Sequence, residues 1–193
     1  MNKIKDFFSK RANSWDENHR VNDFITALKV SLIARNPEEK RVLDIGCGTG
    51  IMLPFLLARF REVSACDISP DMVRIAAKKY PLAKVRTLDF EKKSFYRDDY
   101  FDVIVIYNAF PHFSDSLKVC QRSAALLKKG GLVIIAHSLN RKKLGIIHAR
   151  AGGVVGNHTL AEDRELREIL SLSGFGKIKI AEKEDFILTA FKK

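Results

Sequence analysis

A short segment in the first quarter of the chain constrains the fold more than any other feature. Residues 42–52 read VLDIGCGTGIM, an apolar run followed by a glycine cluster and then the start of a helical stripe. Glycine permits backbone conformations and close ligand approaches that a Cβ atom would prevent. A strand that leads through such a turn directly into a helix predicts an α/β unit with a ligand at the turn.

Alternating strands and helices continue this pattern from residue 41 to residue 136. The expected strands are residues 41–45, 62–67, 84–88, 101–106, 132–136, 178–181 and 186–191. Most are near-continuous apolar runs, which is typical of strands covered by helices on both faces. The last two are joined by too few residues for a helical crossover, so they should form an antiparallel hairpin. The sequence therefore predicts a doubly wound α/β sheet, mostly parallel, with helices on both faces.

Apolar spacing and end signals place the helices. A stripe at helical spacing predicts a helix over residues 15–34 that ends at Asn36 and Pro37. Ser69 followed by Pro70 is a strong helix start. A helix ending near Gly130 precedes the fifth strand, and residues 159–162 predict a capping box for a helix that continues through Leu172.

Composition indicates a single cytoplasmic domain. A chain of 193 residues can bury a core without disulfides or a structural metal. Its three cysteines are widely spaced, which argues against a disulfide framework. The longest apolar run, residues 51–58, is too short for a membrane helix, and the charged N-terminus lacks a signal core. The net charge of +11 is spread along the chain, so we expect no specific nucleic-acid partner.

Two carboxylates accompany the glycine turn. The motif lacks the lysine of a phosphate-binding P-loop, and its third glycine comes one residue too early for the dinucleotide pattern. Asp44 stands just before the turn, where it would repel a pyrophosphate and attract a cationic group. Asp67 ends the second strand, and a carboxylate at that place can accept both hydroxyls of a ribose.

These motifs resemble those of class I methyltransferases that depend on S-adenosylmethionine. The resemblance rests on DIGCGTG, ACDIS, LDF, FDVIVIYNAF and KKGGLVII, in that order. It implies a Rossmann-like seven-stranded sheet with a reversed final strand. The N-terminal FFSKRANSWDE resembles the lid of the small-molecule branch, which includes the ubiquinone/menaquinone methyltransferases. We therefore expect one methyltransferase domain over residues 1–193, with a helical lid at 1–36.

The resemblance also implies which residues hold the cofactor. Asp44 and the backbone from Gly46 through Cys47 to Gly48 should face the methionine part, with Asn108 beside it. Asp67 should bind the ribose hydroxyls. The adenine should lie among Ile68, Met72, Leu88, Asp89 and Phe90, with Asp89 accepting its amino group. Arg11 and Trp15 should close over the cofactor.

The acceptor side is expected where histidines follow the later strands. His112 follows the fourth strand, His137 ends the fifth, and His148 lies in an inserted segment at 138–158 that should form a substrate wall. Each of these histidines is a candidate base, with His137 and His148 favoured. Their spacing, and that of His158, matches no standard metal-ligand motif, so no metal is expected.

Methyl transfer to a small molecule by in-line displacement is therefore the predicted function. An RNA- or protein-modifying methyltransferase is one alternative, although Asn108 does not begin an Asn-Pro-Pro-Tyr-type tetrapeptide. A non-catalytic cofactor-binding module is a second alternative, and a dinucleotide oxidoreductase is a third. The sequence does not specify the acceptor or the oligomeric state.

Overall fold

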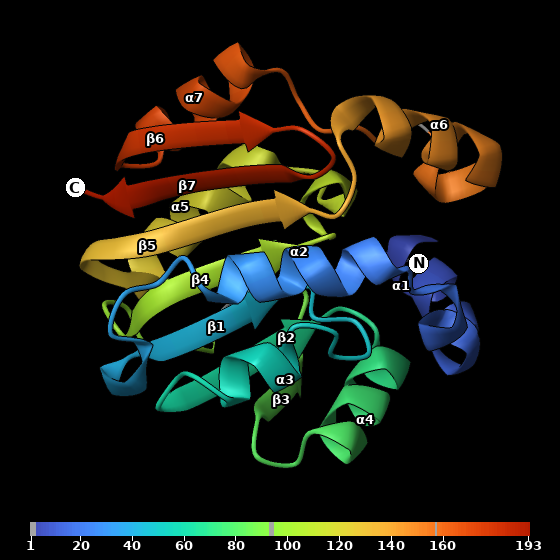
Figure 1. Cartoon of the computed structure of the whole chain (residues 1–193), viewed down its shortest axis with the longest axis horizontal. Coiled ribbons are helices and arrows are strands. Elements are labelled where there is room, and N and C mark those ends of the chain that lie inside the picture. Colours follow the sequence, from blue (N-terminus) through green and yellow to red (C-terminus); the bar gives the residue numbers. More distant parts are fainter. Residues whose placement is uncertain (1–2, 93–94, 157) are drawn as a thin grey trace.

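A computed structural model describes residues 3–92, 95–156 and 158–193. Its centre is a seven-stranded sheet of order β3-β2-β1-β4-β5-β7-β6 (Figure 1). The strands are β1 (Arg41–Ile45), β2 (Glu62–Asp67), β3 (Lys84–Thr87), β4 (Phe101–Tyr107), β5 (Leu127–His137), β6 (Phe175–Glu182) and β7 (Phe186–Lys192). Strands β1 to β5 pair in parallel, whereas β7 runs antiparallel between β5 and β6. The predicted fold class is confirmed.

Strand order determines where a ligand can bind. The chain moves outward from β1 to β2 and β3, then returns to place β4 on the other side of β1. The connections therefore leave β1 and β4 in opposite directions and open a crevice beyond their carboxyl ends. The loops that follow these two strands meet at that crevice.

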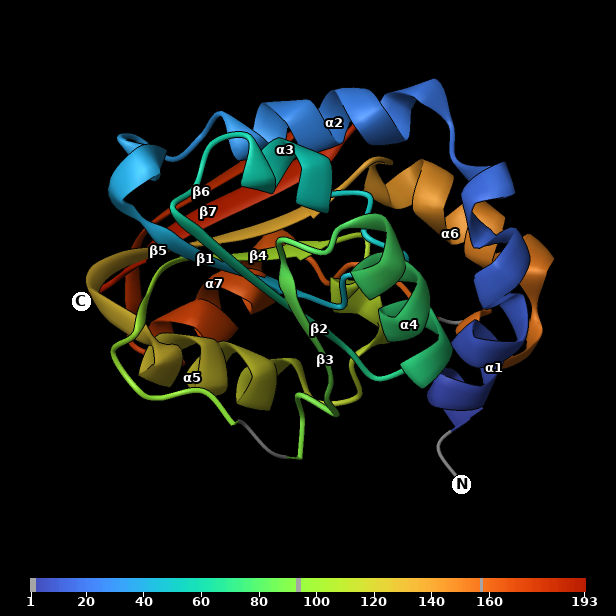
Figure 2. The same cartoon turned by 90° about the horizontal axis from the view of Figure 1, so that it is seen from below.

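Helices cover both faces of the sheet. They are α1 (Lys3–Arg11), α2 (Val21–Ser31), α3 (Leu53–Leu57), α4 (Pro70–Lys79), α5 (Ser116–Leu126), α6 (Arg141–Ala151) and α7 (Asp163–Leu172). Figure 2 shows α2 and α3 over one face, α5 and α7 over the other, and α1 and α6 at one end of the sheet. Each face has its own apolar core, with Leu53 and Val30 in one and Val119 and Leu166 in the other.

Local contacts explain where the predicted element bounds are right or wrong. The helix start at Ser69 is confirmed, since its Oγ accepts a hydrogen bond from Met72 N–H at 3.2 Å. The helix predicted over residues 15–34 exists, but its bounds are wrong, because α2 covers only Val21–Ser31. A 3-10 segment, η1 (Ala12–Asn18), comes first, and α2 starts only at Val21, where the Asp23 carboxylate accepts the Arg20 N–H at 2.7 Å.

Two further bounds differ. The capping box over residues 159–162 is wrong, because buried Leu160 and a hydrogen bond from Arg141 to Ala161 O hold this segment extended, and α7 begins at Asp163. The helix expected to end near Gly130 stops at Leu126, and β5 begins at once, with a register shift against β4.

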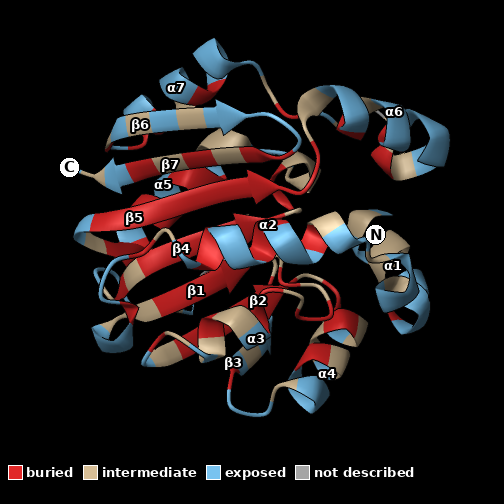
Figure 3. Cartoon of the chain, viewed as in Figure 1, coloured by how far each residue is buried: buried red, intermediate tan, exposed pale blue. Residues whose placement is uncertain are grey.

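Helix α2 packs with the face opposite to its apolar stripe. Thr26, Ala27 and Val30 are buried, whereas Phe24 and Leu28 are exposed. Figure 3 shows both buried and exposed residues along α2. Among the described helices, none is long and apolar enough to cross a membrane.

Candidate active site

A cavity of about 520 Å³ lies beyond the carboxyl ends of the parallel strands. This volume is within the range of small-molecule sites, roughly 300–1,000 Å³. Most of the residues predicted for the site line the cavity, namely Trp15, Gly46, Cys47, Gly48, Asp67, Ile68, Met72, Leu88, Asp89, Phe90, Asn108, His112, His137 and His148. Arg11 and Asp44 are not among its lining residues.

The glycine turn after β1 supplies the cavity floor. Gly46 and Gly48 have φ angles of +74° and +53°, a region that favours glycine. A Cβ atom on Gly46 would lie 2.5 Å from the Ala109 Cβ, so the loop after β4 can approach only because Gly46 lacks a side chain. One on Gly48 would lie 3.9 Å from Trp15 Nε1, which places the indole beside the turn.

Asp67 connects the glycine turn to the start of α4. Its Oδ2 accepts the Gly48 N–H at 2.9 Å, and its Oδ1 accepts the Ser69 N–H at 2.8 Å. Burial raises the pKa of Asp67, and hydrogen bonds from the backbone amides of Ser69, Gly48 and Ile68 oppose that shift. An ionised carboxylate has about four lone-pair sites, so Asp67 retains acceptor capacity for a ligand in the cavity.

Asp44 lies behind the turn, away from the cavity wall. Its Oδ1 is buried without a hydrogen-bond partner among the described residues. Burial, and to a lesser extent the nearby charge of Asp67, raise the pKa of Asp44 to about 8. A cation bound at the turn would favour the ionised form of Asp44 through space.

Arg11 points away from the cavity. Its guanidinium lies 3.7 Å from the centre of the Phe7 ring, and Nη1 donates a hydrogen bond to Phe7 O. The stacking on Phe7 explains why Arg11 does not line the pocket, whereas Trp15, one turn further on, does.

The expected adenine residues form an apolar slot. Met72, Leu88 and Phe90 are almost fully buried, and the Leu88 N–H donates to Asp67 O at 2.8 Å, which holds the end of β3 against β2. Asp89 lies at the edge of the slot and pairs with Lys92 at 3.3 Å. A flat apolar group with a polar edge fits this arrangement.

Asn108 joins the ends of β4 and β5. Its backbone has a φ of +53°, its N–H donates to Ala136 O at 2.9 Å, and its Oδ1 accepts the Ser138 N–H at 2.8 Å. These bonds fix the loop after β4 that contains Ala109, and they thereby keep Ala109 close to Gly46.

His112 and His148 line the cavity, and His158 contacts both of them. His112 and His158 lie with their Nδ1 atoms 2.9 Å apart, and the rings of His112 and His148 are centred 5.2 Å apart. Burial, together with His148 and His158, lowers the pKa of His112 to about 3. Burial, together with His148, lowers the pKa of His137 to about 3. His112 and His137 are therefore neutral at physiological pH.

Hydrogen bonds distinguish the tautomers of two of these histidines. His137 Nδ1 accepts the Leu139 N–H at 3.1 Å, so the proton of the neutral ring lies on Nε2. His148 Nδ1 contacts His158 O, which can only accept, so Nδ1 carries the proton and Nε2 has a free lone pair. His148 can accept a proton or a hydrogen bond at Nε2, whereas His137 can donate a hydrogen bond from its Nε2–H.

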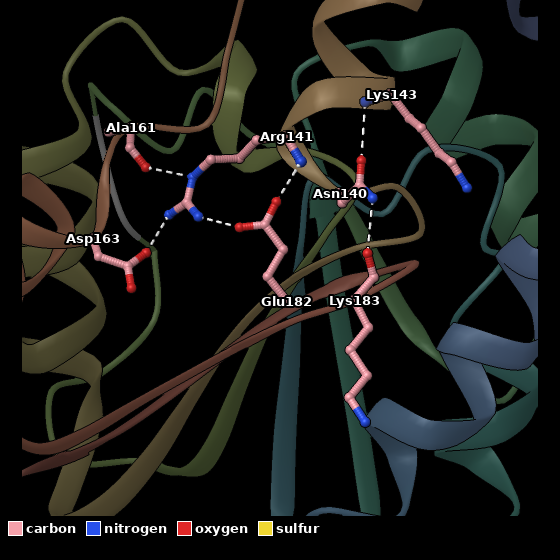
Figure 4. A network of polar contacts seen from close by, with 7 residues as sticks. All are labelled: Asn140, Arg141, Lys143, Ala161, Asp163, Glu182 and Lys183. Carbon is pink, nitrogen blue, oxygen red and sulfur yellow. Dashed lines mark hydrogen bonds and ion pairs between the residues drawn. The ribbon is translucent and has the colours of Figure 1, made fainter.

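The first turn of α6 is fixed by a network of polar contacts (Figure 4). Arg141 donates to Ala161 O at 3.0 Å and to Asp163 at 2.7 Å, and it pairs with Glu182 of β6. Asn140 donates to Lys183 O at 2.7 Å. These bonds fix the base of the helix that contributes His148.

The comparison with protein families identifies the domain. A family model described as a methyltransferase domain matches residues 11–179. The chain belongs to this methyltransferase family. The match includes the glycine turn, Asp67 and all of the candidate histidines, and it confirms the methyltransferase class that the motifs indicate.

Relatives and solved structures agree with this assignment. The chain is 30% identical over 157 residues to a ubiquinone biosynthesis O-methyltransferase of Nitrosomonas europaea; the match covers 75% of the chain and 66% of that relative. The chain thus spans less than two thirds of the relative's length. A structure of an S-adenosylmethionine-dependent methyltransferase from Thermotoga maritima has a TM-score of 0.78 at 19% identity and covers 98% of this chain and 100% of that chain.

A second solved structure has the same fold. It is the magnesium protoporphyrin IX methyltransferase of Synechocystis with bound S-adenosylhomocysteine, which has a TM-score of 0.73 at 20% identity and covers 98% of both chains. Because both structures are below 25% identity, they support the fold of this methyltransferase and not its acceptor.

The cavity of this methyltransferase fits S-adenosylmethionine. A glycine turn beside an indole, a buried carboxylate with free lone pairs and an apolar slot lie along one continuous pocket. Among the described residues, no group of three or more histidine, cysteine, aspartate or glutamate side chains is arranged to hold a metal ion.

Several cavity residues are not identified by the sequence motifs. Phe8, His19, Arg20, Asp23 and Tyr107 all line the pocket. Asp23 gives one sequence signal, since it lies on the face of α2 opposite to the apolar stripe. Tyr107 is the last residue of β4, directly before Asn108. Phe8, His19 and Arg20 depend on how the N-terminal helices fold over the crevice, which no local pattern specifies.

Proposed function

We propose that this methyltransferase transfers a methyl group from S-adenosylmethionine to a hydroxyl of a small, largely apolar molecule. One observation carries the proposal: a single cavity runs from the glycine turn to the imidazoles, with mainly apolar walls between them. The name of the Nitrosomonas relative, an O-methyltransferase, favours oxygen as the acceptor atom.

The cofactor is held by the residues at the floor of the pocket. When bound, it supplies an electrophilic methyl group on a sulfonium. Asp67 would accept the ribose hydroxyls, Asp89 would accept the adenine amino group, and Asn108 with the glycine turn would border the methionine part. Asp44 would contribute its charge from behind the turn. These contacts would hold the methyl donor in a fixed position relative to the acceptor.

His148 receives the proton of the acceptor. With the cofactor bound, the acceptor oxygen would form a bond to the methyl carbon as the carbon–sulfur bond breaks, and the electron pair would stay on sulfur. The hydroxyl proton passes to His148 Nε2, the free lone pair defined by the bond to His158 O. His137 orients the acceptor by donating through Nε2, and His112 packs against Phe8 and His158 to position His148.

Two segments close the pocket in this proposal. Residues 1–36 act as a lid, in which Trp15 and Phe8 cover the cofactor and the acceptor. Residues 138–158 form the opposite wall with α6. Residues 1–2 and 157 of these segments lie outside the described residues. A cytoplasmic location is supported by the free, buried state of Cys47, Cys66 and Cys120.

The test is transfer of a labelled methyl group to a panel of phenols, alcohols, amines and total small RNA. Label in a hydroxyl compound is the expected result. Label in RNA would favour a macromolecular substrate, and binding of S-adenosylhomocysteine with no transfer to any acceptor would favour a non-catalytic module.

A second experiment isolates the base. His148→Ala should lower kcat by about 10²–10⁴ while the affinity for S-adenosylhomocysteine is retained. Added imidazole should restore part of the activity if the folded variant lacks only the base. A folded variant with unchanged kcat would exclude this role.

A further inference from the structure

Helix α2 exposes a continuous apolar stripe to solvent. Its exposed fractions are 76% for Val21, 46% for Phe24, 47% for Ile25 and Leu28, and 55% for Leu32 just beyond the helix. The spacing i, i+3, i+4, i+7, i+11 places all five side chains on one side of the helix. Contiguous apolar patches of this kind mark interaction sites more often than isolated exposed residues do.

The opposite face of α2 is fixed against the protein. Lys29 Nζ and Thr26 Oγ1 bond the Asp185 carboxylate at 2.7 and 3.1 Å, and the Tyr107 hydroxyl donates to Asp23 O at 2.6 Å. Thr26 and Ala27 are fully buried. The helix therefore cannot rotate to bury its stripe without breaking these contacts.

Charge indicates what covers the stripe. Across residues 20–35, every exposed side chain is either large and apolar or basic, the basic ones being Arg20, Lys29 and Arg35. The only carboxylate in this stretch, Asp23, is buried. An apolar stripe bordered by lysine and arginine is typical of helices that lie in the interface of an anionic membrane.

The same composition recurs on α6, at the other side of the pocket. The exposed side chains of α6 are apolar or basic, with Ile146 and Ile147 beside Lys142 and Arg150. Ile147 also lines the cavity, as do Arg20 and Asp23 at the start of α2. Apolar and basic surface is thus present on both helices that border the pocket.

A second copy of the chain fits the stripe less well. In a two-fold contact each patch meets itself, so Arg20 and Arg35, the basic residues at the two ends of the stripe, would approach those of the other copy. No exposed carboxylate lies within the stripe to neutralise them.

We propose that the exposed face of α2 docks this methyltransferase onto an anionic lipid bilayer. Val21, Phe24, Ile25, Leu28 and Leu32 enter the interface. Arg20 and Arg35 meet the lipid phosphates, while Lys29 stays paired with Asp185. The first turn of α2 reaches the cavity, so docking brings the pocket to the membrane surface, where an apolar acceptor would be dissolved.

Vesicle flotation tests this docking with the full chain. We expect binding to vesicles that contain phosphatidylglycerol, weak binding to vesicles of phosphatidylcholine alone, and a decrease as salt rises. Ile25→Ser combined with Leu28→Ser should lower the partition coefficient at least about tenfold, because two apolar side chains no longer enter the interface. Arg35→Glu should also weaken binding.

Leu82→Ser combined with Leu172→Ser is the matched control, since both leucines are exposed and lie on other surfaces. It should bind vesicles like the unmodified chain. All variants should still bind S-adenosylhomocysteine by calorimetry, which separates this proposal from the proposed function.

Three results would overturn the docking. The first is no vesicle binding by the unmodified chain. The second is binding that the α2 substitutions leave unchanged, which would mean adsorption through charge alone. The third is a dimer in sedimentation, without vesicle binding, that the Ile25 and Leu28 substitutions dissociate.

Discussion

Replacement of Asp67 by asparagine tests the cofactor site most directly. The carboxylate holds two backbone N–H groups, from Gly48 and Ser69, and faces the cavity with its remaining lone pairs. Asparagine keeps the shape and one acceptor oxygen but replaces the second oxygen with a donor and removes the charge.

Both binding and stability should fall by predictable amounts. A hydrogen bond to a charged group contributes about 1.5–3 kcal/mol, so losing one and weakening the other should raise the Kd for S-adenosylhomocysteine by about 30- to 1,000-fold. One of the two backbone N–H groups also loses its acceptor, at a cost of about 1–3 kcal/mol. Relief of the buried charge, which raises the pKa of Asp67, offsets part of that cost.

Calorimetry with S-adenosylhomocysteine and urea denaturation measure the two effects separately. Asp71→Asn provides the control, because Asp71 lies in the first turn of the same helix α4, is half-exposed and does not line the cavity. It should change neither Kd nor stability appreciably. A folded Asp67→Asn variant with unchanged Kd would mean that another residue holds the ribose.

Three more predictions concern the turn, the buried acid and a histidine. Gly46→Ala should lower the free energy of unfolding by at least about 2 kcal/mol in urea denaturation, through its positive φ and the contact with Ala109, whereas Gly153→Ala has the φ penalty without a contact. Asp44→Asn should stabilise the ligand-free protein at neutral pH. The pKa of Asp44 is raised from 3.8 to about 8 in the folded protein, so its ionisation lowers the free energy of unfolding as pH rises through that window. Denaturation at about pH 5 and pH 8 should show this loss of stability in the parent protein and not in the variant. His112, with its pKa near 3, should add no acidic limb to the pH–rate profile down to about pH 5, and a limb that disappears in His112→Asn would refute its neutral state.

Strands with apolar side chains on both faces are predictable from sequence. The runs at Arg41–Ile45 and Glu62–Asp67 match the structure at both ends, because nearly every residue in them is buried and the glycine turn or the helix cap ends them sharply. The cavity residues near these strand ends follow from the same logic, since parallel strands end at one edge of the sheet.

Helix boundaries and side-chain directions depend on tertiary contacts that no local pattern contains. The apolar stripe of α2 predicts a helix correctly, yet the face with Thr26 and Ala27 is the one that packs against the protein. Hydrogen bonds to Asp185 and from Tyr107 hold that face in place. Arg11 is close in sequence to Trp15, but its guanidinium stacks on Phe7 instead of facing the pocket.

Arg141 also has a consequence for how this enzyme could diversify. One side chain joins the entry of the inserted segment to its exit, since it contacts both Ala161 and Asp163 from the start of α6. Arg141 thereby holds the two ends of the insertion together, and its ion pair with Glu182 attaches them to strand β6 of the sheet. Apart from His148, the residues between the two ends can vary in length and sequence while the strands and the cofactor floor stay unchanged. Grafting that segment, with Arg141 and His148 retained, is a direct route to altered acceptor selectivity.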